Sequence, residues 1–240
     1  MTDSAAPSRP GRICAAVAAP DSGSVIAAVL PVLDDVDVVE IRLDAMHEVD
    51  FALLRERIER PLLFTNRPVW EGGACAASEE DRLMTLLDAV GHQAAYVDLE
   101  LKTAPSLRQR LLERIAGTTT RLIISSHDFG GTPSAADLSE TLRRQRESGA
   151  HIGKIVTLAG DHLDVLRVLH LQCEARQLGF PLIAFCMGEP GRLSRIITVL
   201  LGGYMTYAAT DERQATAPGQ LSVRRLREAM ACLTGAGAAG

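Results

Sequence analysis

Short apolar runs recur along this chain, and longer segments with helical spacing of apolar residues separate them. The runs are rich in Val, Ile, Leu and Ala, which is typical of buried strands. They cover residues 13–18, 36–43, 61–65, 95–101, 121–125, 151–158, 181–186 and 204–208. The pattern therefore predicts eight strands.

The segments between these runs predict helices. The clearest covers residues 78–90, which open on Ser78 as an N-cap, continue with acidic first-turn residues and end before Gly91. Others run roughly over residues 106–116, 134–148, 162–178, 193–200 and 223–233. Strands that alternate with helices of this length form parallel units with right-handed crossovers. Eight such units predict a closed (β/α)8 barrel of the TIM type.

A single domain suits a chain of 240 residues. We expect residues 12–234 to form the barrel catalytic domain. We expect residues 1–11 and 235–240 to be disordered tails, because their apolar side-chain surface is too small to offset the entropy of ordering. An open doubly wound sheet is the alternative fold, but residues 18–23 lack the glycine-rich phosphate loop that it normally carries.

Composition narrows the function further. The formal net charge is −5, the pI is about 5.7 and no Lys/Arg block stands out, which argues against nucleic acid as a partner. No apolar run has the length of a membrane span, and residues 1–11 contain no apolar export signal. The five cysteines are scattered without a C-x-x-C pair, which favours reduced thiols in a cytoplasmic protein and neither disulfides nor zinc.

Lys154 is the most informative single residue. The chain has 23 arginines but only two lysines, and Lys154 lies within an apolar run over residues 151–158. Arginine can carry a buried charge, but only lysine can lose its proton near neutral pH and attack a carbonyl carbon as an amine. The sequence therefore suggests Schiff-base chemistry.

Other polar residues follow the predicted strands, where the active site of such a barrel lies. Glu40, Arg42 and Asp44 share one strand face by their spacing, either as a site or as a plug of ion pairs. Arg67 and Glu71 precede a double glycine that allows tight turns. Residues 98 and 100 form a second alternating carboxylate pair. Arginines and a lysine share this layer without His/carboxylate metal spacing, so we expect no metal.

The last three loops add an acid–base group and an anion pocket. A lone histidine is more often structural, but His127 follows the fifth strand and a carboxylate such as Glu71 could orient its ring for proton transfer. After the seventh strand, glycines and Pro190 open a helix N-terminus beside Arg195, which predicts a carboxylate pocket. Residues 210–220 are polar and flexible enough to form a lid.

Together these residues resemble the type I 3-dehydroquinate dehydratase family. The matching motifs are E-x-R-x-D at 40–44, F-T-x-R-x-x-x-E-G-G at 64–73, Y-x-D-x-E-L at 96–101, S-x-H-D-F at 125–129, G-A-x-I-x-K-I at 149–155, M-G-x-x-G-x-x-S-R at 187–195 and A-P-G-Q at 217–220. Each motif alone is weak. Seven of them in family order across most of the chain make a strong match.

The resemblance implies a (β/α)8 lyase of the shikimate pathway that converts 3-dehydroquinate to 3-dehydroshikimate and water without a cofactor. Lys154 would form an iminium with the C3 ketone of the substrate. His127 would remove the C2 proton and return it to the departing C1 hydroxyl, and Glu71 would orient His127. Partial desolvation and the nearby Arg42 and Arg67 would favour the neutral amine.

The same resemblance assigns the binding residues. Glu40 and Arg67 would contact the ring hydroxyls, and Arg195, Gln220 and Thr216 would hold the carboxylate of the substrate. Arg42 would be a nearby contact or an organiser of the charged layer. Family members are often dimers, so a homodimer is the expected assembly.

Three departures from the family pattern stand out. Thr216 replaces the usual serine, which adds a methyl group to the lid. His151 replaces an aspartate, which leads us to expect that Lys154 lacks a supporting partner. Residues 207–216 form a slightly longer stretch than usual.

Two other functions remain open on the residues. A class I aldolase for a phosphorylated sugar would need a phosphate cradle near strands 7 and 8, where this chain offers an arginine–glutamine clamp. A barrel kept only as a binding module would have no need of Lys154, His127, Glu71 and Arg195. The reaction alone does not distinguish aromatic amino acid biosynthesis from quinate breakdown or a specialised pathway.

Overall fold

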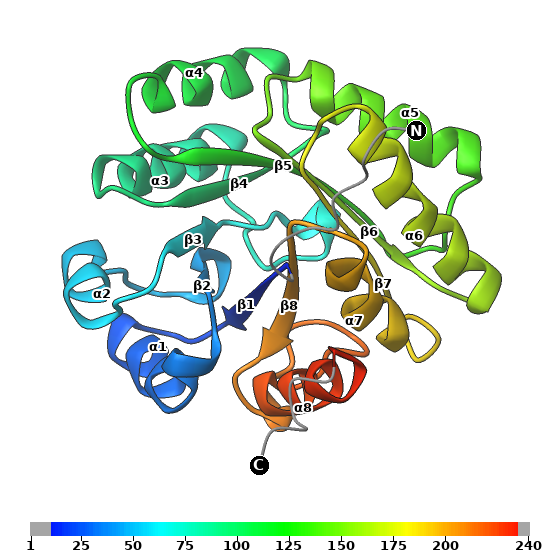
Figure 1. Ribbon diagram of the computed structural model, residues 1–240. Helices are drawn as coiled ribbons and strands as arrows, with labels where there is room; N and C mark the ends of the chain where they lie inside the picture. Colours follow the sequence, from blue (N-terminus) through cyan, green and yellow to red (C-terminus); the bar gives the residue numbers. More distant parts are fainter. Residues whose placement is uncertain (1–10, 235–240) are drawn as a thin grey trace.

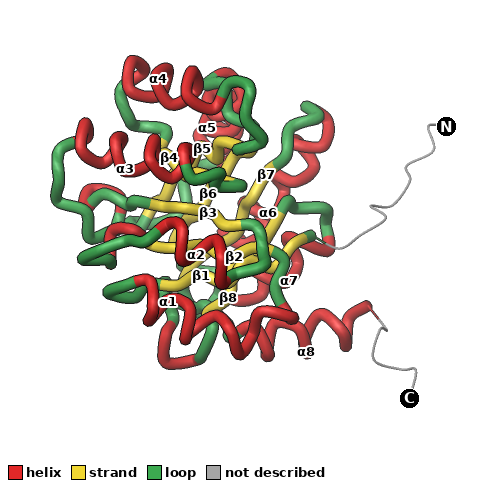
Figure 2. The backbone as a smooth tube through the Cα atoms, turned by 90° about the vertical axis from the view of Figure 1, so that its left-hand side faces the viewer, coloured by secondary structure: helices red, strands yellow, loops and turns green. Residues whose placement is uncertain are grey.

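Eight parallel strands surround the centre of the molecule and eight helices pack outside them (Figures 1 and 2). The computed structural model describes residues 11–234; the predicted tails, apart from Gly11, lie outside the described residues. The strands are β1 Arg12–Val17, β2 Val38–Arg42, β3 Leu62–Thr65, β4 Tyr96–Glu100, β5 Arg121–Asp128, β6 Ile152–Leu158, β7 Leu182–Met187 and β8 Met205–Ala209. The predicted (β/α)8 barrel is confirmed.

The barrel is nearly closed. Hydrogen-bonded ladders join the strands in the order β7-β6-β5-β4-β3-β2-β1-β8. Within residues 11–234 no ladder joins β7 to β8, although the Tyr204 N–H just before β8 donates to the Leu182 carbonyl at the start of β7, over 2.8 Å. The seam between β7 and β8 is therefore joined at its amino end only.

The helices follow the strands in strict alternation. They are α1 Ser22–Val29, α2 Phe51–Arg57, α3 Glu79–Gly91, α4 Pro105–Ile115, α5 Ala135–Glu147, α6 His162–Gln177, α7 Arg192–Leu200 and α8 Val223–Thr234. The Ser78 side chain caps α3 as predicted, by accepting from the Asp81 N–H. The α1 and α2 helices were absent from the predicted set, because eight and seven residues give too few turns for a clear period. The first and last helices, α1 and α8, lie side by side (Figure 1).

Alternation along the strands separates the outer core from the barrel interior. Inside, the amino-end positions are apolar and fully buried: Val38, Leu63, Ile123 and Ile152. The next inward positions on the same strands are Glu40, Thr65, Ser125 and Lys154, and Asp98 takes the matching place on β4. The polar groups therefore begin halfway up the barrel, at the end where active sites of this fold lie.

The upper interior has two unlike sides. We call the inward side chains of β2 to β6 the charged wall; they are Glu40, Arg42, Thr65, Arg67, Asp98, Glu100, Ser125, His127 and Lys154. We call those of β7, β8 and β1 the apolar wall; they are Phe185, Met187, Tyr207 and Ala16. The site lies between these two walls.

Candidate active site

Lys154 points into the barrel from β6. Its Nζ lies 3.0 Å from Asp98 Oδ2, 3.6 Å from Glu40 Oε1 and 4.2 Å from the centroid of the Tyr207 ring. Its own backbone is fixed from outside, since Gln145 of α5 donates to the Lys154 carbonyl over 2.8 Å. The ion-pair partners of this amine are carboxylates, whereas the sequence had pointed only to the nearby Arg42 and Arg67.

Asp98 anchors the amine. Its Oδ1 accepts hydrogen bonds from Ser125 and lies 2.9 Å from Arg67 Nη2, which leaves Oδ2 for Lys154. Burial alone would raise the pKa of Asp98, but Arg67 and Lys154 outweigh burial and hold that pKa well below its ordinary value. Asp98 is therefore a permanent carboxylate in the site. The sequence pattern marked it as one of an alternating pair and gave it no role.

A second carboxylate connects Arg67 to a buried arginine on α3. Glu100 Oε1 pairs with Arg67 Nη1, and Glu100 Oε2 lies 2.6 Å from Arg82 Nη1. Arg82 is 1% exposed and also donates to Thr103 and to the Asn66 carbonyl. Sequence reasoning missed Arg82, although it shares a helix face with the buried Leu86 and Ala89, which lie four and seven positions further on.

His127 and Glu71 form the acid–base pair of the site. The Glu71 Oε1 atom lies 2.9 Å from His127 Nδ1 and accepts the His127 backbone N–H at 3.0 Å. Burial lowers the pKa of His127 well below its ordinary value, with help from Arg67 and Lys154, so the ring is neutral near pH 7. Burial also raises the pKa of Glu71 to about 8. With Nδ1 facing Glu71, Nε2 is the nitrogen left for a ligand.

The loop after β3 is held by an ion pair from β2. Arg42 Nε donates to Asp44 Oδ1 over 2.8 Å, and Asp44 accepts the backbone N–H groups of Arg67 and Ala74. The strand ends at Arg42, and Asp44 lies in a 3-10 turn over Leu43–Ala45. The prediction that all three charges share a strand face is therefore wrong for Asp44, although Arg42 organises the layer as expected.

Tight packing of the β3 loop brings Glu71 close to His127. Gly72 has φ +77°, and a Cβ at this position would collide with the ring of Phe129. Only glycine fits this backbone without strain. The double glycine is thus needed to place Glu71 beside the end of β5.

Arg195 faces the cavity from the start of α7. Its side chain is buried, its Cζ lies 4.6 Å from the Phe185 ring centroid and its Nη2 donates to the Pro218 carbonyl over 3.2 Å. Burial lowers the pKa of Arg195 to about 10, so it stays charged near pH 7. No carboxylate in residues 11–234 forms an ion pair with Arg195. It is therefore free to hold an anionic group of a ligand.

The segment after β8 closes over this arginine. Gln220 Oε1 accepts the Thr216 backbone N–H at 2.7 Å and the Thr216 hydroxyl at 3.1 Å. Gly219 has φ +73°, and a Cβ there would lie 2.5 Å from the Gly188 carbonyl oxygen. The two loops are in close contact, so the lid is docked on the β7 loop.

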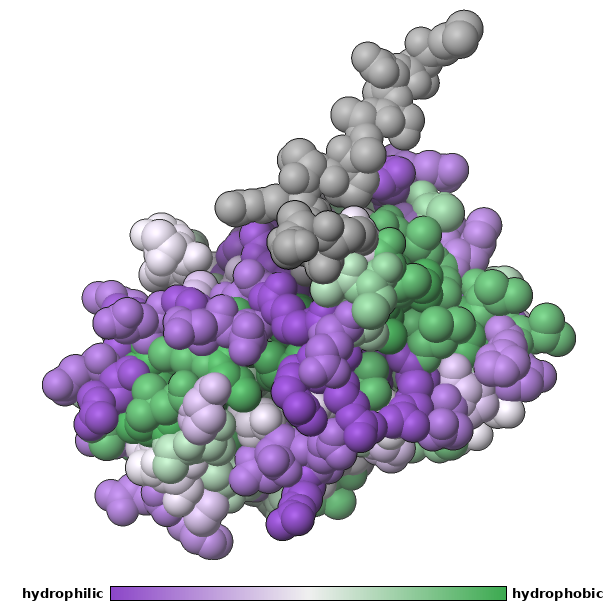
Figure 3. All heavy atoms as spheres, turned by 60° about the horizontal axis from the view of Figure 1, so that its bottom comes forward, coloured by the Kyte–Doolittle hydropathy of each residue, from purple (hydrophilic) through white to green (hydrophobic). Residues whose placement is uncertain are grey.

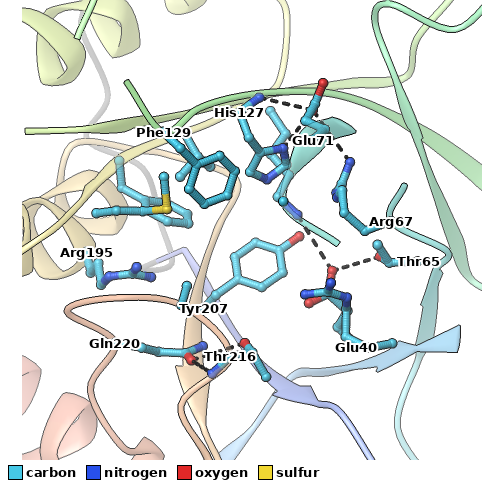
Figure 4. A pocket seen from close by; sticks show the side chains of 17 residues that line it. Glu40, Thr65, Arg67, Glu71, His127, Phe129, Arg195, Tyr207, Thr216 and Gln220 are labelled. Atoms are coloured by element: carbon cyan, nitrogen blue, oxygen red, sulfur yellow. Dashed lines mark hydrogen bonds and ion pairs between the residues drawn. The ribbon is translucent and has the colours of Figure 1, made fainter. Parts of the chain in front are cut away.

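All nine residues proposed from the sequence line one cavity. Its volume, including the part open to solvent, is about 570 Å³. They are Glu40, Arg42, Arg67, Glu71, His127, Lys154, Arg195, Thr216 and Gln220. Figure 4 shows Glu40 and Arg67 on one side of the cavity and Arg195 with Gln220 on another.

His151 lies apart from this cavity. It precedes β6 at the amino end, where its Nδ1 accepts the Leu122 backbone N–H at 3.0 Å. A carboxylate at this position could accept the same N–H. The expectation that His151 deprives Lys154 of a partner is wrong, because the partners of Lys154 come from β2 and β4.

The described part of the chain holds no group of three or more His, Cys, Asp or Glu residues arranged to bind a metal ion. The carboxylates in the cavity are instead paired with arginines and Lys154. A search of the same residues for a helix long and apolar enough to cross a membrane finds none.

The fold and the site define a (β/α)8 barrel in which a buried amine, a neutral imidazole and a charged arginine surround one cavity. The family model for type I 3-dehydroquinase matches residues 13–236. The chain belongs to this family, as the sequence motifs indicated.

Relatives and solved structures agree. A 3-dehydroquinate dehydratase of Desulfotalea psychrophila is 42% identical over 216 residues, which is 90% of this chain and 95% of the relative. A type I 3-dehydroquinate dehydratase of Clostridium difficile, solved with covalently modified comenic acid, matches with a TM-score of 0.86 and 26% identity over 96% of this chain and 94% of that one. The 3-dehydroquinate dehydratase of Enterococcus faecalis matches with a TM-score of 0.80 and 28% identity, over 93% of this chain and 94% of that one.

Proposed function

We propose that this protein is a 3-dehydroquinate dehydratase that acts through a Schiff base on Lys154. The observation that carries the proposal is the meeting of the Lys154 amine and the His127 imidazole in one cavity whose far side holds Arg195. The names of the relatives support the reaction. The covalently modified ligand of the C. difficile enzyme supports covalent chemistry in the family.

Substrate binding follows from charge and position. Arg195 holds the carboxylate of 3-dehydroquinate, with Gln220 and Thr216 of the lid beside it. Glu40 and Arg67 contact ring hydroxyls from the opposite wall. Glu40 already accepts a hydrogen bond from Thr65 over 2.8 Å, which fixes its orientation before the ligand arrives.

The first covalent step joins Lys154 to the C3 ketone. In total, the ammonium form of the side chain and the ketone give an iminium and water: the N–C bond forms, the C–O bond breaks, and the oxygen leaves with two protons that come from nitrogen. Asp98, held by Arg67 and Ser125, keeps the amine in place. Its negative charge then stabilises the iminium cation that replaces the ammonium.

The second step uses His127. The iminium withdraws electrons, so the neutral imidazole can take the C2 proton while the C–H pair moves toward nitrogen. The resulting enamine expels the C1 hydroxyl, which leaves as water with the proton that His127 carries. A water molecule then hydrolyses the iminium and releases 3-dehydroshikimate and the amine.

The remaining predictions belong to this proposal. We propose that residues 12–234 form the catalytic domain and that the enzyme works in the cytoplasm, in the shikimate pathway. Hydrophobic and hydrophilic side chains are mixed on the face in Figure 3. The exposed Leu163 and Leu166 of α6 and Leu193 of α7 add apolar surface that suits the predicted homodimer.

A spectroscopic assay tests the function directly. The full chain, mixed with 3-dehydroquinate, should produce the ultraviolet absorbance of a conjugated enone, and Lys154→Met should produce none. The same enzyme should not cleave phosphorylated sugars, since no phosphate cradle accompanies Arg195 in the described loops. A wild-type protein that is folded but shows no enone would contradict the proposal.

A further inference from the structure

Tyr207 of β8 is the one residue of the apolar wall that carries a hydroxyl into the cavity. The Tyr207 ring lies against the Phe185 ring, with their centroids 5.9 Å apart. The Lys154 Nζ atom lies 4.2 Å from the centroid of the Tyr207 ring. Figure 4 shows the side chain reaching across the cavity from the side of Thr216 toward that of Arg67. The hydroxyl therefore lies in the region where a ligand would meet the amine.

The hydroxyl is buried and has no hydrogen-bond partner among the described residues. Tyr207 as a whole is 4% exposed, so bulk water does not replace the missing partner. A buried polar group without a partner costs about 1–3 kcal/mol. Such a group is expected where a ligand completes the site.

The chemical state of this hydroxyl determines what it can bind. Burial raises the pKa of Tyr207 well above its ordinary value, and Glu40 adds to the effect. The group therefore keeps its proton and acts as a donor. It needs an acceptor oxygen from the ligand.

Tyr204 provides a contrast within the same barrel. Its hydroxyl lies at the amino end, where it is 3.0 Å from the Tyr96 hydroxyl and accepts from Arg121 Nη1 at 2.8 Å. This tyrosine is satisfied by the protein, whereas Tyr207 is not. The difference indicates that the Tyr207 hydroxyl is available to bind a ligand, whereas the Tyr204 hydroxyl stabilises the fold.

We propose that the Tyr207 hydroxyl donates a hydrogen bond to the ketone oxygen of the carbon that Lys154 attacks. The inference rests on the proposed function and adds a substrate-contacting residue to it. The attacked carbon must come within bonding distance of Nζ, which lies above the Tyr207 ring. Its oxygen then lies within reach of the donor on that ring.

The hydrogen bond acts while the adduct forms. As the nitrogen pair makes the N–C bond, the π pair of the ketone moves to oxygen, and a fixed donor stabilises the charge that develops there. The oxygen next takes one proton from the nitrogen and the proton that the ammonium gave up before the attack, and it departs as water, which leaves the iminium. Tyr207 gives a hydrogen bond only and ends the cycle with its own proton.

The test uses Tyr207→Phe, with Tyr204→Phe as the matched control. Each variant loses one hydroxyl and keeps its ring. Enzyme in excess is mixed with 3-dehydroquinate and quenched with borohydride at increasing times, and the trapped adduct is measured by mass. We expect adduct formation to slow about tenfold or more in Tyr207→Phe and to stay at the wild-type rate in Tyr204→Phe.

A second readout separates this role from a structural one. If adduct formation becomes slow, the deuterium isotope effect on kcat for substrate labelled at C2 should fall toward one in Tyr207→Phe. A wild-type trapping rate in that variant would overturn the assignment, as would a rise in KM alone. If the wild-type enzyme itself forms no adduct, it is the proposed function that fails.

Discussion

The charged wall and the apolar wall of the barrel differ in how they are held together. Continuous ladders join β2 to β6, and the charges there pair with one another. On the other side, no ladder joins β7 to β8 within the described residues, and the lid contacts Arg195 there. The reacting groups therefore lie on the side whose strands are continuously hydrogen-bonded, while the residues for binding and closure lie beside the open seam.

The charged wall tolerates burial because its charges balance. Glu40, Asp98 and Glu100 face Arg67, Lys154 and the outer Arg82. Arg42 pairs with Asp44, so each of these charges has a partner of opposite sign. Removing one member would leave an uncompensated buried charge, which costs far more than the pair itself contributes. The wall therefore works as a unit. Beside the apolar wall, Arg195 of α7 is a buried charge with no ion-pair partner among the described residues, so its partner must come from the ligand.

The largest effect is expected at the acid–base group of the charged wall. His127→Asn should lower kcat by about 10²- to 10⁴-fold, because the general base is lost, while the amine stays in place. Steady-state assays measure the loss, and borohydride trapping should still detect the adduct. A variant with near wild-type kcat would remove His127 from the proposed mechanism.

The next effect tests whether the charged wall is a unit. Arg82→Met should lower the free energy of unfolding by about 3–5 kcal/mol, because Glu100 loses one of its two buried partners. Urea unfolding measures it. Arg143→Met, which removes an exposed arginine with two carboxylate partners, is the control and should leave the midpoint unchanged. Equal midpoints in both variants would show that burial of the charge does not matter.

A change on the opposite side should affect binding more than chemistry. Arg195→Met should raise KM about 10- to 100-fold, which corresponds to a lost hydrogen bond between charged groups, with a smaller change in kcat. Arg192→Met removes a half-buried arginine of the same helix, which already pairs with Glu189, and should leave KM unaltered. A fall in kcat without a rise in KM would place Arg195 in the chemical step instead.

The smallest effect concerns pH. Burial raises the pKa of Glu71 to about 8, so Glu71 is largely protonated below this pH and gains its charge above it. Only the ionised form accepts the Nδ1–H of His127 and leaves Nε2 ready to take a proton. Wild-type kcat/KM should therefore rise through about pH 8, and Glu71→Gln, which cannot ionise, should lose this rise. An inflection that persists in the variant would belong to another group.

The strands and the polar residues at their ends were predicted because a period of two and a strand end are local signals, whereas the family resemblance supplied the binding roles of residues such as Thr216 and Gln220. His127 shows where local signals fail: β5 runs on to Asp128, whereas apolar residues alone predicted its end at 125. Asp98 was missed as the partner of Lys154 because pairing across strands is set by register, and Arg82 was missed because its pairing with Glu100 depends on how α3 packs against β4. The chain displays neither. Tyr207 received no role from the sequence, because the missing partner of its hydroxyl becomes visible only in the structure.

Lys154 carries the central claim, and the other lysine of the chain provides an internal control. The enzyme is incubated with 3-dehydroquinate and borohydride, digested, and its peptides are weighed. The account predicts a reduced adduct on Lys154, none on Lys102, and none anywhere in Lys154→Met. An unmodified Lys154 in active enzyme, or equal labelling of Lys102, would contradict it.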